Sequence, residues 1–345
     1  MPRVSTSIKK ALTDGRVEKV EVDGLIKGAQ QDGKVTNTER KQLTDMLEKS
    51  ADKFAPEARS SLAAFLGNPG PISTTEPVTP AVPAAPPASQ VPLKDDPAPL
   101  LKHSSTPMEE YPGELFVDGV NFDDVLQGQI ANCFMVSAFS AVAYAHPEAI
   151  EQAIKDNGDG TYDVRLFEKG PSGKWTPVSF RIDGDLPMGF GGPLYAKSRS
   201  NRELWVSLLE KAYAVEKKGY EFVGNGGLAT DVMSTLTGTR SFHYPMSTME
   251  PGEVFSLIQE SAASKCPMAA GTHGEDSGIN YSGTGVHAWH CYTVLGAEVE
   301  QGVKYVLLRN PWGQVEPGND GKNDGIFKMK LSDFVRLYEG VHVNG

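Results

Sequence analysis

The chain has 345 residues, and 33 Lys and Arg against 44 Asp and Glu give it a formal net charge of −11. This length exceeds one average domain, and 39% hydrophobic residues suffice for a buried core. So acidic a chain lacks the basic face that nucleic acids and anionic membranes require. No apolar run is long enough for a membrane span, no secretory signal is apparent, and three cysteines are too few for a disulfide scaffold. We therefore expect a cytoplasmic protein with no nucleic-acid or membrane partner.

Composition divides the chain into three parts. Residues 1–68 carry apolar residues at helical spacing and predict a small all-α module. Residues 69–106 predict a linker, since ten of the chain's 24 prolines lie between Pro69 and Pro99, and such a segment buries too little apolar surface to order itself. Residues 107–345 predict an α+β unit with one lobe over about 107–238 and a second over about 239–345.

The first module contains a short repeat. Asp14-Gly15 and Asp32-Gly33 each begin the pattern Asp-Gly-x-Val-x-x-x-Glu, which matches the second half of an EF-hand loop. The first half of such a loop needs carboxylates, and Lys10, Leu12, Gly28 and Gln30 stand at those positions. We expect turns between short helices here rather than calcium sites.

The α+β unit shows two kinds of periodicity. Helical spacing of apolar residues recurs in four segments, which are 132–145, 203–218, 254–264 and 331–338. Alternating strand patterns recur in five, which are 162–166, 178–182, 292–294, 305–308 and 325–330. Helices therefore gather in the first half and strands in the second, with a seam near residues 237–244.

Cys133 is the first residue suited to covalent chemistry. It follows a glycine-containing loop and Asn132, which is a plausible N-cap, and it begins the predicted helix. A thiol at a helix N-terminus faces backbone N–H groups that favour the thiolate, and the same groups can stabilise an oxyanion. Taken alone, a cysteine at such a position is more often a buried, inert residue than a nucleophile.

His290 and Asn310 are the residues that complete such a site. His290 enters a predicted strand, which gives a general base a rigid support. Asn310 ends the next strand, where its side chain can fix the tautomer of an imidazole, although Asn310-Pro311-Trp312-Gly313 is also good turn chemistry. The sequence His287-x-x-His290-Cys291 has the spacing of zinc ligands but lacks a recognisable fourth ligand.

Together these segments resemble the catalytic core of the calpain family. The resemblance extends over roughly 230 residues from about Glu114, and the stretches that carry it are Leu115-Phe116-Val117-Asp118-Gly119, Gln127-Gly128-x4-Cys133, Leu186-Pro187, Leu204-Trp205-x2-Leu208-Leu209-Glu210-Lys211-Ala212-Tyr213-Ala214, Gly226-Gly227, His290-x-Tyr292-x-Val294-x-Gly296-Ala297, Asn310-Pro311-Trp312-Gly313 and Asp333-Phe334. It implies a two-lobed, papain-like cysteine protease core. We also expect a bacterial source.

The resemblance implies a role for each matching residue. Cys133 matches the nucleophile, His290 the base, Asn310 the residue that orients the base, and Gln127 the side chain of the oxyanion hole. The residues that it implies along the substrate cleft are Gly226, Gly227, Trp289 and Trp312. Two positions depart from the family: Phe134 stands where Trp is usual, and Trp289 stands where Gly precedes the base. The second departure keeps His287 as an alternative base.

The resemblance also implies one calcium ion in the cysteine-bearing lobe. Its ligands would be the backbone carbonyls of Val117 and Gly119 and the carboxylates of Asp124 and Glu203, which are the hard oxygen donors that calcium takes. The two acids also have an explanation without any ligand: Asp124 would be an exposed loop acid, and Glu203 an acid that the helix dipole favours at a helix start. The second calcium site of the family, in the histidine-bearing lobe, is not expected in this chain, because Ile326 stands where the family has Glu.

The resemblance therefore implies a cysteine endopeptidase that acts on proteins or peptides, with calcium as a cofactor and no organic cofactor. Residues 1–68 would serve in targeting, partner docking or intramolecular inhibition. Two alternatives remain open from the sequence. One is acyl transfer, in which an amine replaces water on the same thioester, and the other is a binding protein that keeps the calpain-like shell without proteolysis.

Overall fold

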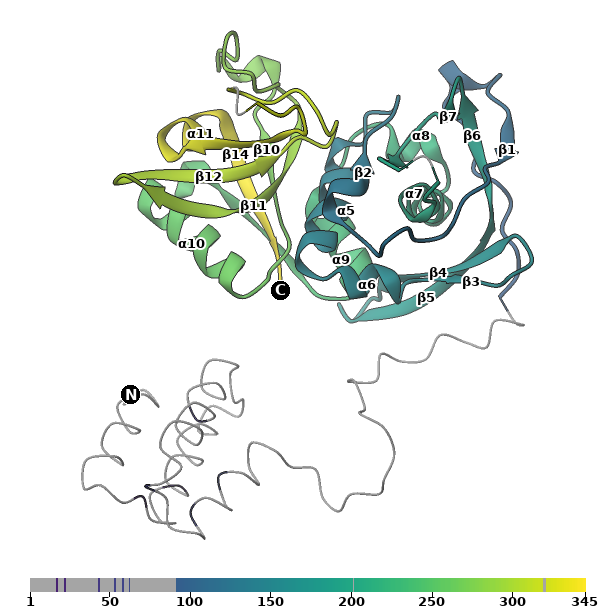
Figure 1. Cartoon of the computed structure of the whole chain (residues 1–345), viewed down its shortest axis with the longest axis horizontal. Helices are drawn as coiled ribbons and strands as arrows, with labels where there is room; N and C mark the ends of the chain where they lie inside the picture. Colours follow the sequence, from purple (N-terminus) through teal and green to yellow (C-terminus); the bar gives the residue numbers. More distant parts are fainter. Residues whose placement is uncertain are drawn as a thin grey trace. The chain divides into compact units, whose positions relative to one another are not determined.

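The computed structural model divides the chain into two compact units, residues 1–81 and residues 82–345 (Figure 1). The structure describes residues 91–345, apart from Asn201, Asn319 and Asp320, and six single positions in the first unit, which are Val17, Val22, Leu43, Lys53, Ala58 and Leu62. In the first unit, five of these side chains are fully buried apolar residues. The predicted helical module, its Asp-Gly turns and the linker up to residue 90 otherwise lie outside the described residues.

The first part of the second unit, residues 107–238, is here called the α-rich half. Its helices are α5 (Cys133–Ala145), α6 (Pro147–Glu151), α7 (Trp205–Glu216), α8 (Tyr220–Val223) and α9 (Ala229–Thr237), with a 3-10 turn η4 (Phe122–Asp124). Its strands are β1 (Met108–Glu110), β2 (Val125–Leu126), β3 (Ile154–Asp156), β4 (Thr161–Lys169), β5 (Trp175–Asp183), β6 (Asp185–Gly189), β7 (Gly192–Pro193) and β8 (Lys197–Ser198). Strands β3, β4 and β5 form an antiparallel sheet beside α7 (Figure 1).

Residues 239–345 are here called the β-rich half. Its strands are β9 (Ser241–Pro245), β10 (Met268–Thr272), β11 (Cys291–Glu300), β12 (Val303–Arg309), β13 (Ile326–Lys330) and β14 (Tyr338–Asn344). They form one antiparallel sheet in the order β13-β12-β11-β10-β14-β9. Its helices are α10 (Pro251–Ala263) and α11 (Leu331–Leu337), with short 3-10 turns η5 (Met246–Thr248) and η6 (Glu275–Ser277).

The predicted α+β class is confirmed, and every helix and strand predicted in the α+β unit is present; their ends agree within a few residues, except that the strand expected over 292–294 extends to Glu300. The hairpin of β4 and β5 has the expected turn at Gly170-Pro171-Ser172-Gly173, with the Gly173 N–H donating to the Gly170 carbonyl (2.9 Å). The sequence patterns missed β10 and β14, which lie inside the large sheet, and α9, which precedes the predicted seam.

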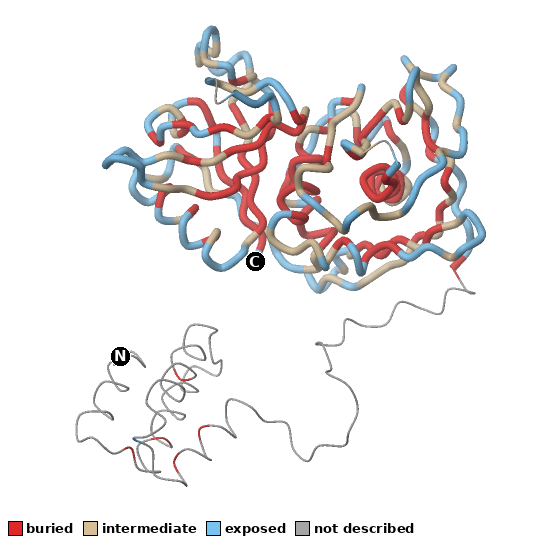
Figure 2. Tube along the Cα trace, in the orientation of Figure 1, coloured by how far each residue is buried: buried red, intermediate tan, exposed pale blue. Residues whose placement is uncertain are grey.

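Each half has its own hydrophobic core. The first core surrounds α5, α7 and α9, and α7 is buried along almost its whole length at the centre of the α-rich half (Figure 2). The second core lies between the large sheet and helices α10 and α11. Helix α5 packs on β10 and β11, and Ser137 joins the two halves there, because its Oγ donates to the Cys291 carbonyl (2.8 Å) and its own carbonyl accepts from Thr293 Oγ1 (2.9 Å).

Residues 91–103, here called the strap, pack along the α-rich half. The Lys94 N–H donates to the Arg181 carbonyl of β5 (2.9 Å), and the Leu100 N–H donates to the Tyr195 hydroxyl (3.0 Å). Leu100 belongs to the first core, and the strap ends in a 3-10 turn, η3 (Leu101–His103). The second half of the predicted linker therefore makes specific contacts with the α-rich half.

Among the helices that the structure describes, none is both long and apolar enough to cross a membrane.

Candidate active site

Cys133 begins helix α5, as the sequence predicts. The Asn132 carbonyl accepts hydrogen bonds from the Met135 and Val136 N–H groups (2.8 and 3.1 Å), so the helix starts directly at the cysteine. The Asn132 side chain makes no cap bond to the helix, which differs from the expected N-cap. Cys133 itself is half-buried, and its thiol lies at the helix end that the macrodipole makes positive.

His290 and Asn310 are in direct contact in the β-rich half. His290 Nε2 lies 3.0 Å from Asn310 Oδ1, and both residues are buried. The contact follows from the sheet register, because His290 immediately precedes β11, Asn310 immediately follows β12, and Thr293 of β11 pairs with Arg309 of β12. Neutral His290 then carries its proton on Nε2, since Asn310 Oδ1 only accepts, and Nδ1 keeps its lone pair.

The Asn310 amide is fixed by two further hydrogen bonds. Its Nδ2 donates to the Val315 carbonyl (2.8 Å), and its Oδ1 also accepts from the Trp312 N–H (3.2 Å). Val315 has φ of +61°, a left-handed conformation that is strained for a β-branched residue. Asn323 Oδ1 accepts from the Val315 N–H (2.9 Å) and holds this turn in place. The loop after β12 therefore orients the oxygen of Asn310 toward the imidazole.

The described structure contains no hydrogen bond between Cys133 and His290. Burial raises the pKa of the Cys133 thiol, and nearby backbone groups of Cys291 and Phe134 oppose this rise. Burial lowers the pKa of His290 to about 4, against the opposing bond to Asn310 and together with the neighbouring His287. In this conformation, the thiol and the imidazole are both neutral at pH 7.

Gln127 lies on the loop before Cys133 and is tied to both halves. Its N–H donates to the Pro311 carbonyl (2.8 Å), which places it beside the loop that carries Asn310. Its side-chain Nε2 donates to the Ile130 carbonyl (2.7 Å), so the amide is folded back on its own loop. Its Oε1 is buried and has no hydrogen-bond partner among the described residues.

Arg309, next to Asn310 in sequence, also joins the halves. It is fully buried, and its Nη2 donates to the Val125 and Asp123 carbonyls of the α-rich half (2.7 and 3.0 Å). The same nitrogen lies 3.3 Å from a carboxylate oxygen of Asp123. The Asn310 end of β12 is thereby fixed against the segment that precedes the Gln127 loop.

The rings of His287, Tyr292 and Trp312 surround the imidazole of His290. The Trp312 ring lies over His290 (4.7 Å between centroids) and over His287 (4.6 Å), so the indole covers the His290–Asn310 contact. His287 Nε2 is buried without a hydrogen-bond partner in the described part of the chain. His290 thus has an orienting amide, and His287 does not.

Trp289 and the glycine pair lie at the surface. Trp289 is 70% exposed and has φ of +52°, a backbone conformation that favours the glycine found there in calpains. Gly226 and Gly227 are exposed, and a Cβ on Gly227 would lie 2.6 Å from the ring of Phe134, which follows Cys133. The Gly227 backbone therefore packs directly against the Phe134 ring, and any side chain at position 227 would collide with it.

Three of the four residues implied as calcium ligands lie close to one another, and these are Val117, Asp124 and Glu203. Glu203 is buried, one of its carboxylate oxygens accepts from the Val117 N–H (2.9 Å), and the other has no partner among the described residues. Asp124 Oδ2 accepts from the Asn121 N–H (2.8 Å). Burial raises the pKa of both carboxyls, and the charge of Asp124 raises that of Glu203 further. Two desolvated acids with an unpaired oxygen fit a hard cation.

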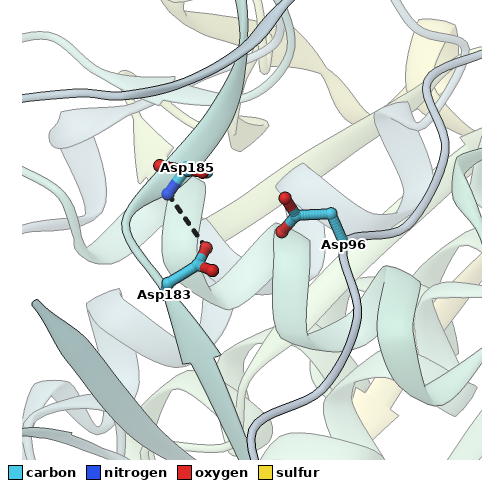
Figure 3. A group of neighbouring side chains, drawn as sticks. All are labelled: Asp96, Asp183 and Asp185. Atoms are coloured by element: carbon cyan, nitrogen blue, oxygen red, sulfur yellow. Dashed lines mark hydrogen bonds between the residues drawn. The ribbon is translucent and has the colours of Figure 1, made fainter.

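A second group of acids is occupied by a lysine. Asp96 of the strap, Asp183 and Asp185 place their carboxylates together (Figure 3). Lys211 of α7, whose side chain is 1% exposed, forms ion pairs with Asp96 and with Asp183 (2.6 Å) and donates to the Asp185 carbonyl (2.7 Å). The ammonium supplies the positive charge that a metal ion would bring, so this group is an internal ion-pair network.

Comparison with known proteins identifies the family. Residues 103–320 match the family described as calpain family cysteine protease. The chain belongs to the calpain family. Its similar relatives include the calpain-type cysteine protease ADL1 of Oryza sativa subsp. japonica, at 32% identity over 63% of this chain and 10% of that protein. The calpain-2 catalytic subunit of Rattus norvegicus is 26% identical over 67% of this chain and 36% of that protein.

The chain thus spans between a tenth and about a third of the length of these relatives. The resemblance noted from the sequence is confirmed at the level of the family. Sequence reasoning assigned no role to Glu210, Lys211 or Arg309, although a Glu-Lys pair inside the apolar helix 203–218 was a signal that both charges need buried partners.

Proposed function

We propose that the chain is a cysteine endopeptidase that hydrolyses peptide bonds of proteins through Cys133, His290 and Asn310. The observation that carries this proposal is the 3.0 Å contact between His290 Nε2 and Asn310 Oδ1, which leaves Nδ1 as the basic nitrogen. Membership in a family of cysteine proteases supports the same assignment. The two halves would then be the two lobes of a papain-like core, with the substrate between them.

The proposed reaction uses these residues in two stages. Cys133 transfers its proton to His290 Nδ1 and attacks the peptide carbonyl carbon, and the Cys133 N–H and Gln127 Nε2 stabilise the oxyanion. His290 then protonates the leaving amine, and water hydrolyses the thioester with His290 as the base. Gln127 Nε2 has a second N–H to offer to the oxyanion, since the bond to the Ile130 carbonyl uses only one of its two.

The substrate chain is proposed to lie along the exposed Gly226-Gly227 backbone, in contact with Trp289 and beside Trp312. At these glycines a substrate backbone meets no side chain. Trp312 would in addition shield the His290–Asn310 hydrogen bond from water, since its ring covers the imidazole.

Calcium is the cofactor that the Val117, Gly119, Asp124 and Glu203 site fits. Bound there, it would neutralise the two buried acids and fix the segment 117–124, which leads directly to the Gln127 loop. We propose that this ordering aligns Cys133 with His290, which are not hydrogen-bonded in this conformation. Residues 1–68 are proposed to act in targeting or inhibition of the protease.

Casein digestion by the full chain tests the activity. The wild-type protein should cleave casein, and Cys133→Ala should abolish cleavage because no other described residue replaces the thiol. Cys266→Ser is the matched control, since Cys266 lies in the β-rich half away from His290 and Asn310. Equal activity in the wild type and Cys133→Ala would refute the proposal.

Titration calorimetry with calcium tests the cofactor separately. Wild type should bind one calcium ion per chain in the catalytic unit, and Asp124→Ala should remove that binding. Asp123→Ala is a poor control, because Asp123 pairs with Arg309, so Glu148→Ala on the exposed surface of α6 serves instead. Absence of heat in the wild type, or unchanged binding in Asp124→Ala, would remove calcium from this site.

A further inference from the structure

Glu210 is a buried carboxyl directly behind the nucleophile. It lies in the middle of α7 and is 2% exposed. Among the described residues, no lysine, arginine or histidine forms an ion pair with it, although its neighbour Lys211 has several acidic partners. A carboxyl in such surroundings is costly unless hydrogen-bond donors meet it.

The donors that meet Glu210 come from the two segments that flank Cys133 in space. Asn132 Nδ2 donates to Glu210 Oε1 (2.6 Å), and Asn132 is the residue immediately before the cysteine. The Ala196 N–H donates to both carboxyl oxygens (3.1 and 3.0 Å). Asn132 is fully buried and its own Oδ1 has no partner in the described structure, so the Glu210 bond alone orients its side chain.

Both segments also determine where the backbone N–H of Cys133 points. The Asn132 carbonyl receives the first hydrogen bonds of α5, so a shift of Asn132 moves the start of the helix. The 194–196 segment lies against the Gln127–Gln129 loop, since the Gln129 N–H donates to the Leu194 carbonyl (2.9 Å). Glu210 therefore connects the helix that carries the thiol with the loop that carries Gln127.

We propose that Glu210 is a positioning residue for the nucleophile: through Asn132 and Ala196 it fixes the Cys133 thiol and the Cys133 N–H relative to Gln127. This inference rests on the proposed protease function. Asn132 suits the role because an amide donates to the carboxyl, whereas an acidic residue would add a second acceptor there. A residue needed only for packing would be apolar at this depth.

Two substitutions of Glu210 separate positioning from packing. Glu210→Gln keeps an oxygen that accepts from Asn132 and Ala196, whereas Glu210→Leu keeps the volume and loses both bonds. With a quenched peptide substrate, we expect Glu210→Gln to stay within about threefold of the wild-type kcat/KM, and Glu210→Leu to lose about 100-fold in kcat with little change in KM, because small displacements at a reacting centre have effects of this size.

A second readout follows the thiol itself. The rate of Cys133 alkylation by iodoacetamide, followed by mass spectrometry of the Cys133 peptide from pH 5 to 9, reports thiolate formation without any substrate cleavage. The pH midpoint should shift in Glu210→Leu and return to the wild-type value in Glu210→Gln. Ser234→Ala is the matched control, because the buried Ser234 Oγ of α9 contacts Ser241 Oγ (2.9 Å) and neither Asn132 nor Ala196, and its midpoint should equal that of the wild type.

Asn132→Asp keeps the test decisive if Glu210→Leu does not fold. It places a second carboxyl against Glu210, and we expect a loss of kcat that deepens as pH rises and the two acids repel each other. Unchanged kcat and alkylation in Glu210→Leu or Asn132→Asp would overturn the proposal, and so would an equal loss in Glu210→Gln and Glu210→Leu. If the wild type cleaves no peptide, the protease proposal fails, and the alkylation midpoints still decide the role of Glu210.

Discussion

In the two halves, burial shifts the pKa values of the groups near the reactive residues in opposite directions. In the α-rich half, the carboxyl of Glu210 lies behind Cys133, and burial raises its pKa to about 8. In the β-rich half, the buried titrating groups include two histidines, His290 and His342, and burial lowers the pKa of each to about 4. A neutral carboxyl therefore contacts the residue before Cys133, and a neutral imidazole contacts Asn310.

This difference follows from the two architectures. The α-rich half surrounds the buried helix α7, whose charged residues bond to other segments through their side chains: Glu210 to Asn132 and Ala196, and Lys211 to the adjoining ends of β5 and β6. The β-rich half positions His290 and Asn310 by the pairing of β11 with β12, and the loop after β12 adds bonds to backbone groups. Side-chain chemistry should therefore dominate the stability of the first half, and backbone register that of the second.

Of the changes considered, substitution of Lys211 should destabilise the α-rich half most. Lys211→Met leaves Asp96, Asp183 and the Asp185 carbonyl without their buried ammonium, and we expect a loss of about 3 kcal/mol in the free energy of unfolding. Urea denaturation followed by tryptophan fluorescence measures it. Lys217→Met is the matched control, since Lys217 follows the last residue of α7 and its ammonium pairs with Glu216 while partly exposed, and it should cost less than about 1 kcal/mol. Equal losses in the two variants would contradict the network.

Truncation separates the strap from the rest of the linker. Removal of residues 1–90 leaves Asp96 and Leu100 in place and should leave the catalytic unit folded with nearly the same melting temperature. Removal of residues 1–103 exposes the Lys211 network and the pocket of Leu100, and should lower the melting temperature by about 10 °C for a loss of several kcal/mol in a unit of this size. If the chain that lacks residues 1–103 melts like the one that lacks only residues 1–90, the strap contributes little.

Because the two pKa values shift in opposite directions, one group should lower stability at acid pH (the acid limb) and the other at alkaline pH (the alkaline limb). The folded pKa of His342 lies at about 4, below its ordinary 6.5, so its contribution is complete above 6.5 and is lost as pH falls from 6.5 to 4. The folded pKa of Glu210 lies at about 8, above its ordinary 4.5, so its contribution is complete below 4.5 and is lost as pH rises from 4.5 to 8.

Two neutral substitutions isolate these limbs. His342→Gln should remove only part of the stability loss at acid pH, since His290 contributes the same kind of loss; the groups facing His342 are His243 and, through it, Glu339. Glu210→Gln should flatten the alkaline limb, and each effect should amount to about 3 kcal/mol or less. Urea unfolding of both variants and the wild type at pH 4.5, 6 and 8 measures the differences. Parallel pH curves for the wild type and either variant would contradict the corresponding shift.

The sequence predicted the elements around the reactive residues because those elements carry strong local patterns. The apolar helix after Cys133, the alternating strand after His290 and the strand before Asn310 each repeat with the period of their own structure. Asn310 itself was predicted from its place at a strand end. The contact between His290 and Asn310 followed from the register of two strands that are adjacent in sequence.

The features that the sequence did not predict depend on distant segments. Strand β14 pairs with β10 and β9, and Tyr338-Glu339-Gly340 gives it a weak local pattern. The role of Glu210 depends on Asn132 and Ala196, which are 78 and 14 residues away, and that of Lys211 depends on Asp96 in a proline-rich segment. Periodicity reports which face of a helix is buried, but it does not report which donors from elsewhere meet a charge on that face.

Asn310→Asp replaces the neutral amide that contacts His290 in the β-rich half with a carboxylate. The new carboxylate would still accept from His290 Nε2, but it would lose the donation that Asn310 Nδ2 makes to the Val315 carbonyl. A negative charge beside a buried imidazole raises its pKa, because it favours the imidazolium. Because His290 must be neutral to accept the thiol proton, we therefore expect the acid limb of kcat/KM to move to higher pH, with a loss of about tenfold at pH 7 from the released amide.

Asn310→Ala is the matched control for that shift, since it removes the contact without adding charge. It should lose about 100-fold in kcat, and its acid limb should not move to higher pH, because His290 keeps its burial and gains no anion. Asn323→Ala, which loosens Val315 without touching the imidazole, should cost only a few-fold. If Asn310→Asp and Asn310→Ala gave the same pH profile, His290 would not be held by residue 310 in the working enzyme. The imidazole of His290 would then have to be held mainly by its contact with the Trp312 ring.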